Sequence, residues 1–138
     1  MKNLLKKIKE SEGYSKTVYQ CTEGYDTIGY GFAVKDLELS KEVSETILRE
    51  KITKLKKDIE NRFEWVVNAP PKIQDVVIEM CYQIGINGFS KFKKTIYFLE
   101  TEQYWEASVE MIDSLWARQT PNRAKKLSDE VRGNLNVR

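Results

Sequence analysis

Glu12, Cys21 and Thr27 are the side chains near the amino end whose types and spacing could support acid–base chemistry. The chain contains no histidine, which excludes Ser-His-Asp and Cys-His catalysis and histidine-ligated zinc. Catalysis must therefore use carboxylates, a thiol, tyrosine, lysine or arginine. A helix dipole disfavours a charged carboxylate at the end of a helix, so Glu12 suits a proton donor. From position alone, an exposed carboxylate is the better explanation of Glu12, and Thr27 on its own is an ordinary strand residue.

The two cysteines, Cys21 and Cys81, are too far apart in the sequence to form a zinc-finger pattern. Both fit a reducing compartment in which they stay as thiols. Cys21 falls at a predicted turn, an unusual place for a free cysteine, which more often behaves as a small buried apolar residue. Cys81 falls on an apolar helical stripe with Val77 and Ile84, so we expect it in the core.

The composition indicates one globular domain without a cofactor. The chain has 138 residues, 41% of them apolar, and its 23 basic and 21 acidic residues leave a net charge of +2. This balance excludes a dedicated nucleic-acid binder. No apolar run is long enough to span a membrane, no glycine-rich motif indicates a phosphate site, and no pattern indicates a metal site. The amino end lacks the apolar core of a secretion signal, so we expect synthesis and folding in a cytoplasm.

The elements around these residues divide the chain into a small and a large part. Residues 3–11 predict a short amphipathic helix that ends before Gly13. Residues 17–34 are rich in β-branched and aromatic residues around a turn at 22–24, which predicts a hairpin or a three-stranded sheet. Glycines 24, 29 and 31 indicate tight turns or close backbone approaches.

Everything after this region has helical spacing. Ser40 is a candidate N-cap for a helix of six turns, which the Asn68–Pro71 segment ends. We expect the next helix to end at 85–88, with shorter helices around 92–99 and 105–116, and a last helix opened by Thr120-Pro121. The prediction is one α+β domain over 1–138. Its β-subdomain covers about 13–38, residues 1–12 and about 39–138 form the helical lobe and connecting helix, and a cleft lies between the lobes.

The active-site region resembles that of the T-even phage lysozyme family, the phage-type endolysins. The family motif is Glu, eight residues, Asp or less often Cys, five residues, Thr, and Glu12, Cys21 and Thr27 have this spacing. The residues around the motif match the family too: Thr-Glu-Gly-Tyr begins at residue 22, and Thr-Ile-Gly begins at Thr27. In the second half, Gln83-Ile-Gly and the string Trp-Ala-Arg-Gln-Thr-Pro-Asn-Arg-Ala-Lys over 116–125 match independently. The resemblance covers nearly the whole chain, which looks shorter than the best-known member between residues 32 and 39.

This resemblance implies a lysozyme-like fold and a muramidase that hydrolyses the β-1,4 bond between N-acetylmuramic acid and N-acetylglucosamine in bacterial peptidoglycan. It makes Glu12 the general acid and Thr27 a residue that helps to place the attacking water. It also implies that four residues of the helical lobe belong to the glycan-binding site: Tyr82, Gln83, Thr95 and Arg123. In this family, an arginine at the position of Arg123 pairs with the general acid, here Glu12. Without the resemblance, these four are explained as helix-face or surface residues.

Cys21 is the departure that matters, because the more familiar residue at this position is Asp. A glycosidase that uses two carboxylates pairs an acid with a base or a nucleophile, and an unperturbed thiol is mostly protonated at pH 7. Three roles are open for Cys21. It orients water and gives inversion, which we favour; it attacks the sugar as a thiolate and gives retention; or it only fills space.

Two other functions and one surface activity are compatible with the sequence. A lytic transglycosylase needs only Glu12, and a peptidoglycan-binding relative would have lost catalysis at Cys21. The basic first helix, with lysines at 2, 6, 7 and 9, is a weak candidate for membrane disruption, and we expect no stable membrane insertion. The resemblance implies a phage or prophage endolysin that stays in the host bacterial cytoplasm, is released through a holin and then acts on the cell wall. We expect a monomer.

Overall fold

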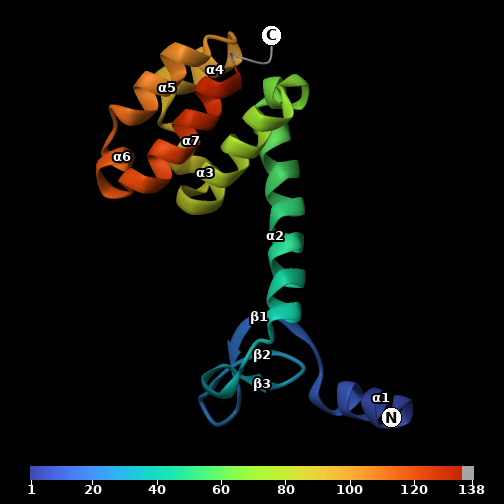
Figure 1. Ribbon diagram of the computed structural model, residues 1–138. Coiled ribbons are helices and arrows are strands. Elements are labelled where there is room, and N and C mark those ends of the chain that lie inside the picture. The colour runs from blue at the N-terminus through green and yellow to red at the C-terminus, as the bar shows by residue number, and fades with distance from the viewer. Residues whose placement is uncertain (135–138) are drawn as a thin grey trace. The chain divides into compact units, whose positions relative to one another are not determined.

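The computed structural model describes residues 1–134 and consists of helices and one small antiparallel sheet (Figure 1). This mixture confirms the α+β class expected from the sequence. The chain divides into two compact units, Met1–Glu45 and Thr46–Arg138. Each unit is described by itself below.

The first unit begins with α1 (Lys2–Glu12). The helix ends because Gly13 has a φ of 70°, a conformation that favours glycine, while its N–H still donates to the carbonyl of Lys9. Glu12 is thus the last residue of α1, and the chain turns toward the sheet directly after it.

The sheet has three antiparallel strands in chain order, as the sequence predicts: β1 (Ser15–Gln20), β2 (Asp26–Gly29) and β3 (Phe32–Ala33). Thr27 is the register partner of Tyr19 on one side and of Ala33 on the other. A short 3-10 helix, η1 (Val34–Asp36), follows the sheet. The strands therefore place Thr27 in the central strand, one residue after the turn segment that holds Cys21.

The helix α2 (Lys41–Arg62) begins at Ser40, whose side chain accepts a hydrogen bond from Val43 N at 3.1 Å, and this confirms the predicted N-cap. The 3-10 helix η2 (Glu64–Asn68) separates α2 from α3 (Pro71–Ser90). The expected end of α3 at 85–88 is wrong in part. Gly85, at φ 80° and ψ 159°, interrupts the helical backbone, but helical turns resume and continue to Ser90.

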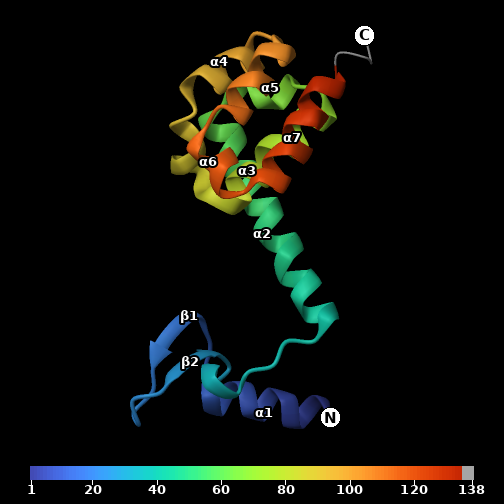
Figure 2. The same ribbon diagram turned by 60° about the vertical axis from the view of Figure 1, so that its left-hand side comes forward.

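The second unit continues with α4 (Lys93–Glu100), α5 (Tyr104–Ile112), α6 (Leu115–Gln119) and α7 (Pro121–Gly133), and α5 packs along α7 (Figure 2). The single helix expected around 105–116 is in fact two, because Ser114 leaves the helical conformation and caps α6 by accepting from Ala117 N. Thr120 does not cap α7 with its side chain; its hydroxyl donates instead to the carbonyl of Trp116.

One hydrophobic core fills the second unit. Its buried members come from α2, η2 and every later helix of the described chain, and α3 contributes six of them. Phe89 is completely buried, with its ring edge-to-face with Phe63 at 5.6 Å and stacked on Phe92 at 6.5 Å between centroids. This core fixes the surfaces on which the candidate residues of the helical unit lie.

Candidate active site

Cys21 lies in the tight turn between β1 and β2. Its N–H donates to the carbonyl of Tyr25, and its own carbonyl accepts from Gly24 N, both at 2.9 Å. Gly24 has a φ of 85°, which allows the chain to reverse here. The thiol is only partly buried, so solvent and reagents reach it.

The backbone of this turn lowers the pKa of the Cys21 thiol. Hydrogen bonds from the backbone of Tyr25 and then of Glu23 to the sulfur are the largest causes, and a bond with the Thr27 hydroxyl adds to them. Partial burial and the Glu23 carboxylate act in the opposite direction and are outweighed. Donors that stabilise the thiolate increase the fraction of Cys21 that is ionised near neutral pH, and the thiolate is the form that can act as a base or a nucleophile.

Thr27 is the buried partner of this thiol. Thr27 is only 5% exposed, its hydroxyl donates to the carbonyl of Tyr25 at 3.0 Å, and it also contacts the Cys21 sulfur. Because β2 holds the threonine and the turn holds the cysteine, their contact follows from the hairpin register. The structure thus brings together two of the three residues that the motif identified.

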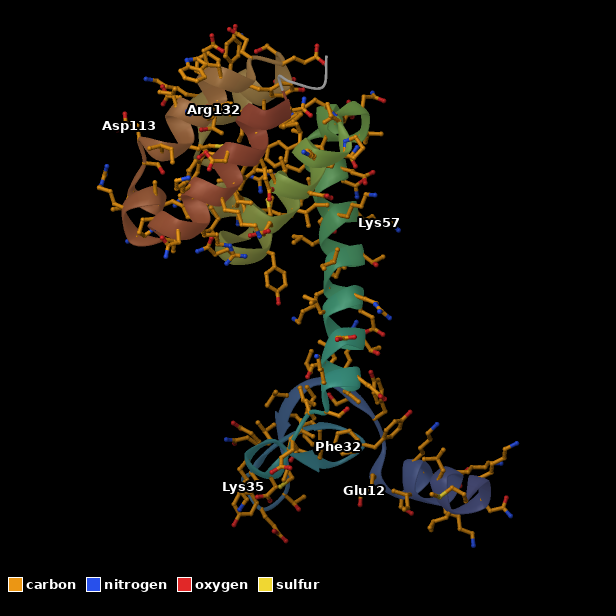
Figure 3. All side chains as sticks on the ribbon, in the orientation of Figure 1. Glu12, Phe32, Lys35, Lys57, Asp113 and Arg132 are labelled. Atoms are coloured by element: carbon orange, nitrogen blue, oxygen red, sulfur yellow. The ribbon has the colours of Figure 1, made fainter. Side chains whose placement is uncertain are left out.

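Glu12, which is labelled in Figure 3, is the last residue of α1. Its carboxyl group lies beside Gly31, in the connection from β2 to β3. A Cβ atom built on Gly31 would overlap the Glu12 carboxyl oxygen Oε2 and would lie 3.0 Å from its Cδ. Gly31 also has a φ of 75°. The absence of a side chain at Gly31 is therefore what allows the Glu12 carboxyl group to lie against the backbone.

The pocket that contains Thr95 belongs to the second unit. Thr95 is only 2% exposed and lines a pocket of about 620 Å³ together with Phe92, Glu110 and Trp116. Gln83 accepts a hydrogen bond from the indole Nε1 of Trp116 at 2.9 Å. Trp116 thus lines the same pocket as Thr95 and bonds to Gln83, two of the predicted glycan contacts.

Arg123 and Tyr82 are linked by a glutamate that the sequence did not single out. Arg123 Nε lies 3.0 Å from Glu79 Oε2 in an ion pair. Glu79 and the half-exposed Tyr82 both line a groove of about 430 Å³ with Leu48 and Ile52. The pairing of Arg123 with Glu79 had no signal in the sequence, because the two residues are distant in the chain and lie on different helices.

Cys81 lies in the core, as expected from its apolar stripe. Burial raises the pKa of this thiol to about 12, although the positive charge of Arg62 acts in the opposite direction. The two cysteines thus differ in both exposure and ionisation, and neither forms a disulfide.

Metal and membrane features are not found among residues 1–134. No group of three histidine, cysteine or acidic side chains in this range is arranged to hold a metal ion. None of the helices described is both long and apolar enough to cross a membrane.

Comparison with known proteins identifies the class of this chain. The family model described as phage lysozyme matches residues 9–130, which include both the Glu12 region and the helices of the second unit. The chain is therefore a glycoside hydrolase, an enzyme with a lysozyme-like, peptidoglycan-lytic function. More narrowly, it belongs to the phage lysozyme family.

Three relatives extend this comparison. The chain is 28% identical to probable T4-type lysozyme 1 of Dictyostelium discoideum over 94% of each chain. It is 26% identical to probable T4-type lysozyme 2 of the same organism, over 87% of this chain and 88% of the relative. The pre-baseplate central spike protein Gp5 of Enterobacteria phage T4 is also 26% identical, over 88% of this chain but only 26% of the spike protein.

The contact between Glu12 and Gly31 leads to a prediction. We expect Gly31→Ala to reduce the lytic rate about 10- to 100-fold, because the new methyl group displaces the Glu12 carboxyl group. Gly85→Ala is the matched control: Gly85 also has a positive φ, but nothing lies within 4 Å of its Cβ position. Both variants should lose about 1–2 kcal/mol of stability, as thermal unfolding will measure. Equal lytic rates in the two variants would contradict the claim that the Glu12 carboxyl group must lie against Gly31 for activity.

Proposed function

We propose that this enzyme hydrolyses the β-1,4 bond between N-acetylmuramic acid and N-acetylglucosamine, with Glu12 as the general acid. The observation that carries the proposal is the Glu12, Cys21, Thr27 spacing in a member of the phage lysozyme family. Two geometric features support it. The Glu12 carboxyl group lies against the backbone at Gly31, and Cys21 and Thr27 are in contact.

In the proposed mechanism, Glu12 donates its proton to the glycosidic oxygen as the bond from that oxygen to the sugar C1 breaks. A water molecule attacks C1 and loses a proton to the Cys21 thiolate, while Thr27 helps to place this water. The anomeric configuration is inverted. Proton exchange with solvent then returns Glu12 to the acid form and Cys21 to the thiolate, so the net reaction consumes one water.

The lowered pKa of Cys21 favours this role over a passive one. An ordinary thiol with a pKa of about 8.5 is a few per cent ionised at pH 7 and is a poor base. The turn hydrogen bonds increase the thiolate fraction at that pH.

We further propose that four residues of the second unit bind the glycan strand: Tyr82, Gln83, Thr95 and Arg123. Two observations support the assignment. Thr95 and Trp116 line one pocket, and Gln83 bonds to Trp116. The groove beside Tyr82 is lined by Glu79, which holds Arg123 in an ion pair.

Fragment analysis of purified peptidoglycan tests the reaction. Mass spectrometry of the released fragments should show reducing N-acetylmuramic acid ends, one water heavier than the anhydro form. Anhydro ends would instead indicate a transglycosylase that uses Glu12 without a water base. If no fragments appear, the chain binds peptidoglycan without cleaving it, and the proposed mechanism is wrong.

The two cysteines provide a test of the proposed base. Iodoacetamide should inactivate the enzyme by alkylating Cys21, and it should react at a lower pH than with an ordinary thiol because the pKa of Cys21 is lowered. Cys81 should not react in the folded protein, since it is buried and burial raises its pKa to about 12. A Cys81→Ser variant should therefore be as sensitive as the wild type. Full activity after stoichiometric alkylation of Cys21 would show that this thiol is a spectator.

The biological setting of the enzyme is a separate proposal, which rests on the resemblance to phage-type endolysins. We propose that it is a monomeric endolysin, held in the host bacterial cytoplasm until a holin permeabilises the membrane, and that both units together form one lysozyme domain. Expression in a bacterium should leave the culture intact until a permeabilising agent is added, and the optical density should then fall within minutes. Lysis without permeabilisation would contradict this role.

A further inference from the structure

An exposed tryptophan on α5, Trp105, has an arginine side chain packed against its ring. The Trp105 side chain is 52% exposed, and the guanidinium carbon of Arg132 lies 4.3 Å from the centroid of its ring. A cation over the face of an indole is attracted to it. The ring is therefore fixed against α7 while about half of the residue stays open to solvent.

Arg132 is itself anchored in the core of the helical unit. Its Nε donates to the hydroxyl of Ser108 at 3.2 Å, and Ser108, which is fully buried, donates to the carbonyl of Trp105 at 2.7 Å. These bonds join the arginine of α7 (labelled in Figure 3) to the backbone of α5. Because Trp105 is held in this way, little of its rotamer freedom remains to be lost on binding.

The surroundings of Trp105 fit a sugar ring. Val109 and Ile112 follow at the next two turns of α5 and are also exposed, while Glu106 beside Trp105 is exposed and carries a carboxylate. The C–H groups on one face of a hexose are slightly positive and are attracted to the negative face of an indole. A carboxylate acceptor such as that of Glu106 is suited to the hydroxyl groups around the sugar ring.

The small size of this exposed surface favours a sugar over a protein as the ligand. A stable protein interface buries about 800 Å² on each partner. Three exposed apolar side chains on α5 are too few for such an area. A single hexose, in contrast, covers one indole ring.

We propose that Trp105 and Arg132 form an accessory site that binds a sugar of the peptidoglycan strand, in addition to the residues assigned above. The inference rests on the proposed function, because it takes the polymer to be the substrate. A strand that is bound at a second point cannot diffuse away between encounters with the catalytic residues, so a weak contact raises its effective concentration. The site therefore contributes to retention on the polymer rather than to bond cleavage.

Cosedimentation with purified sacculi tests this site in a Glu12→Gln background, where the polymer is not degraded. Trp105→Ala should weaken binding about three- to tenfold, and Trp105→Phe, which keeps an aromatic face, should retain most of the affinity. Tyr97→Ala is the control, since Tyr97 is 56% exposed and its ring packs against Phe98. Equal binding by the Trp105→Ala and Tyr97→Ala variants would overturn the proposal.

A titration with the N-acetylglucosamine tetramer identifies the binding residue directly. The chain has three tryptophans, and comparison with the Trp105→Phe variant assigns the Trp105 indole N–H signal in a nitrogen–proton spectrum. We expect this signal to shift with the sugar concentration, and an unshifted signal at saturation would contradict the site. Fragment release by the wild-type enzyme is measured in parallel. Its failure would reject the proposed function, whereas its success with an unshifted Trp105 would reject only the accessory site.

Discussion

Replacement of Glu12 by Gln should abolish measurable lysis. The amide keeps the shape of the side chain, so it can still lie against Gly31, but it has no acidic proton for the leaving oxygen. General acid–base help contributes about 10²–10⁴ in rate, which corresponds to about 3–5 kcal/mol of the barrier. Turbidity loss of a peptidoglycan suspension measures the effect.

Glu10→Gln provides the matched control for this variant. Glu10 lies on the same helix, two residues earlier, and is exposed. The substitution removes the same charge from α1 without touching the contact at Gly31, so we expect nearly wild-type lysis. Near wild-type activity in Glu12→Gln, with an unchanged thermal unfolding temperature, would exclude Glu12 as the acid.

The largest effect on stability should come from Phe89→Ala. Phe89 is completely buried at the end of α3, between the rings of Phe63 and Phe92. Its removal loses the burial of a large apolar side chain and leaves a cavity in a core that relaxes only in part. Such substitutions cost about 3–5 kcal/mol, and denaturant unfolding will measure the loss.

Leu115→Ala is the comparison for Phe89→Ala within the same unit. Leu115 is 61% exposed, so its truncation should change the free energy of unfolding by no more than about 0.5 kcal/mol. Because the chain has two compact units, the transition that Phe89→Ala shifts should be the one that reports the unit beginning at Thr46. Similar losses in both variants would indicate that the aromatic cluster around Phe89 is not the centre of the core.

Local signals in the sequence identified most of the elements correctly. The β-branched residues and the turn at 22–24 predicted the sheet, Ser40 marked the start of α2, and Thr120-Pro121 marked the start of α7. These features depend on neighbours within four residues, which a sequence shows directly. The contact of Thr27 with the Cys21 sulfur is of the same kind, because one short hairpin carries both residues.

The features that the sequence did not show depend on backbone choices or on distant partners. Helical turns resume after Gly85 because an interruption at one glycine does not end the apolar pattern of α3. Ser114 divides the expected helix at 105–116 because its hydroxyl accepts from one of the free N–H groups at the start of α6, that of Ala117. Glu79 carried no pattern of its own, and Gly31 was predicted only as a tight turn or a close backbone approach. Only the folded chain places these two residues beside Arg123 and Glu12.

The contrast between the two thiols makes the enzyme a ready single-site labelling target. Cys21 is accessible and ionises readily, whereas Cys81 is enclosed by the core. A thiol-specific fluorophore or spin label should therefore attach at one position of the natural sequence, without removal of a competing cysteine. Its emission or line shape would then report the motion of the β1–β2 turn directly, and glycan added to the labelled protein would be detected at the hairpin itself.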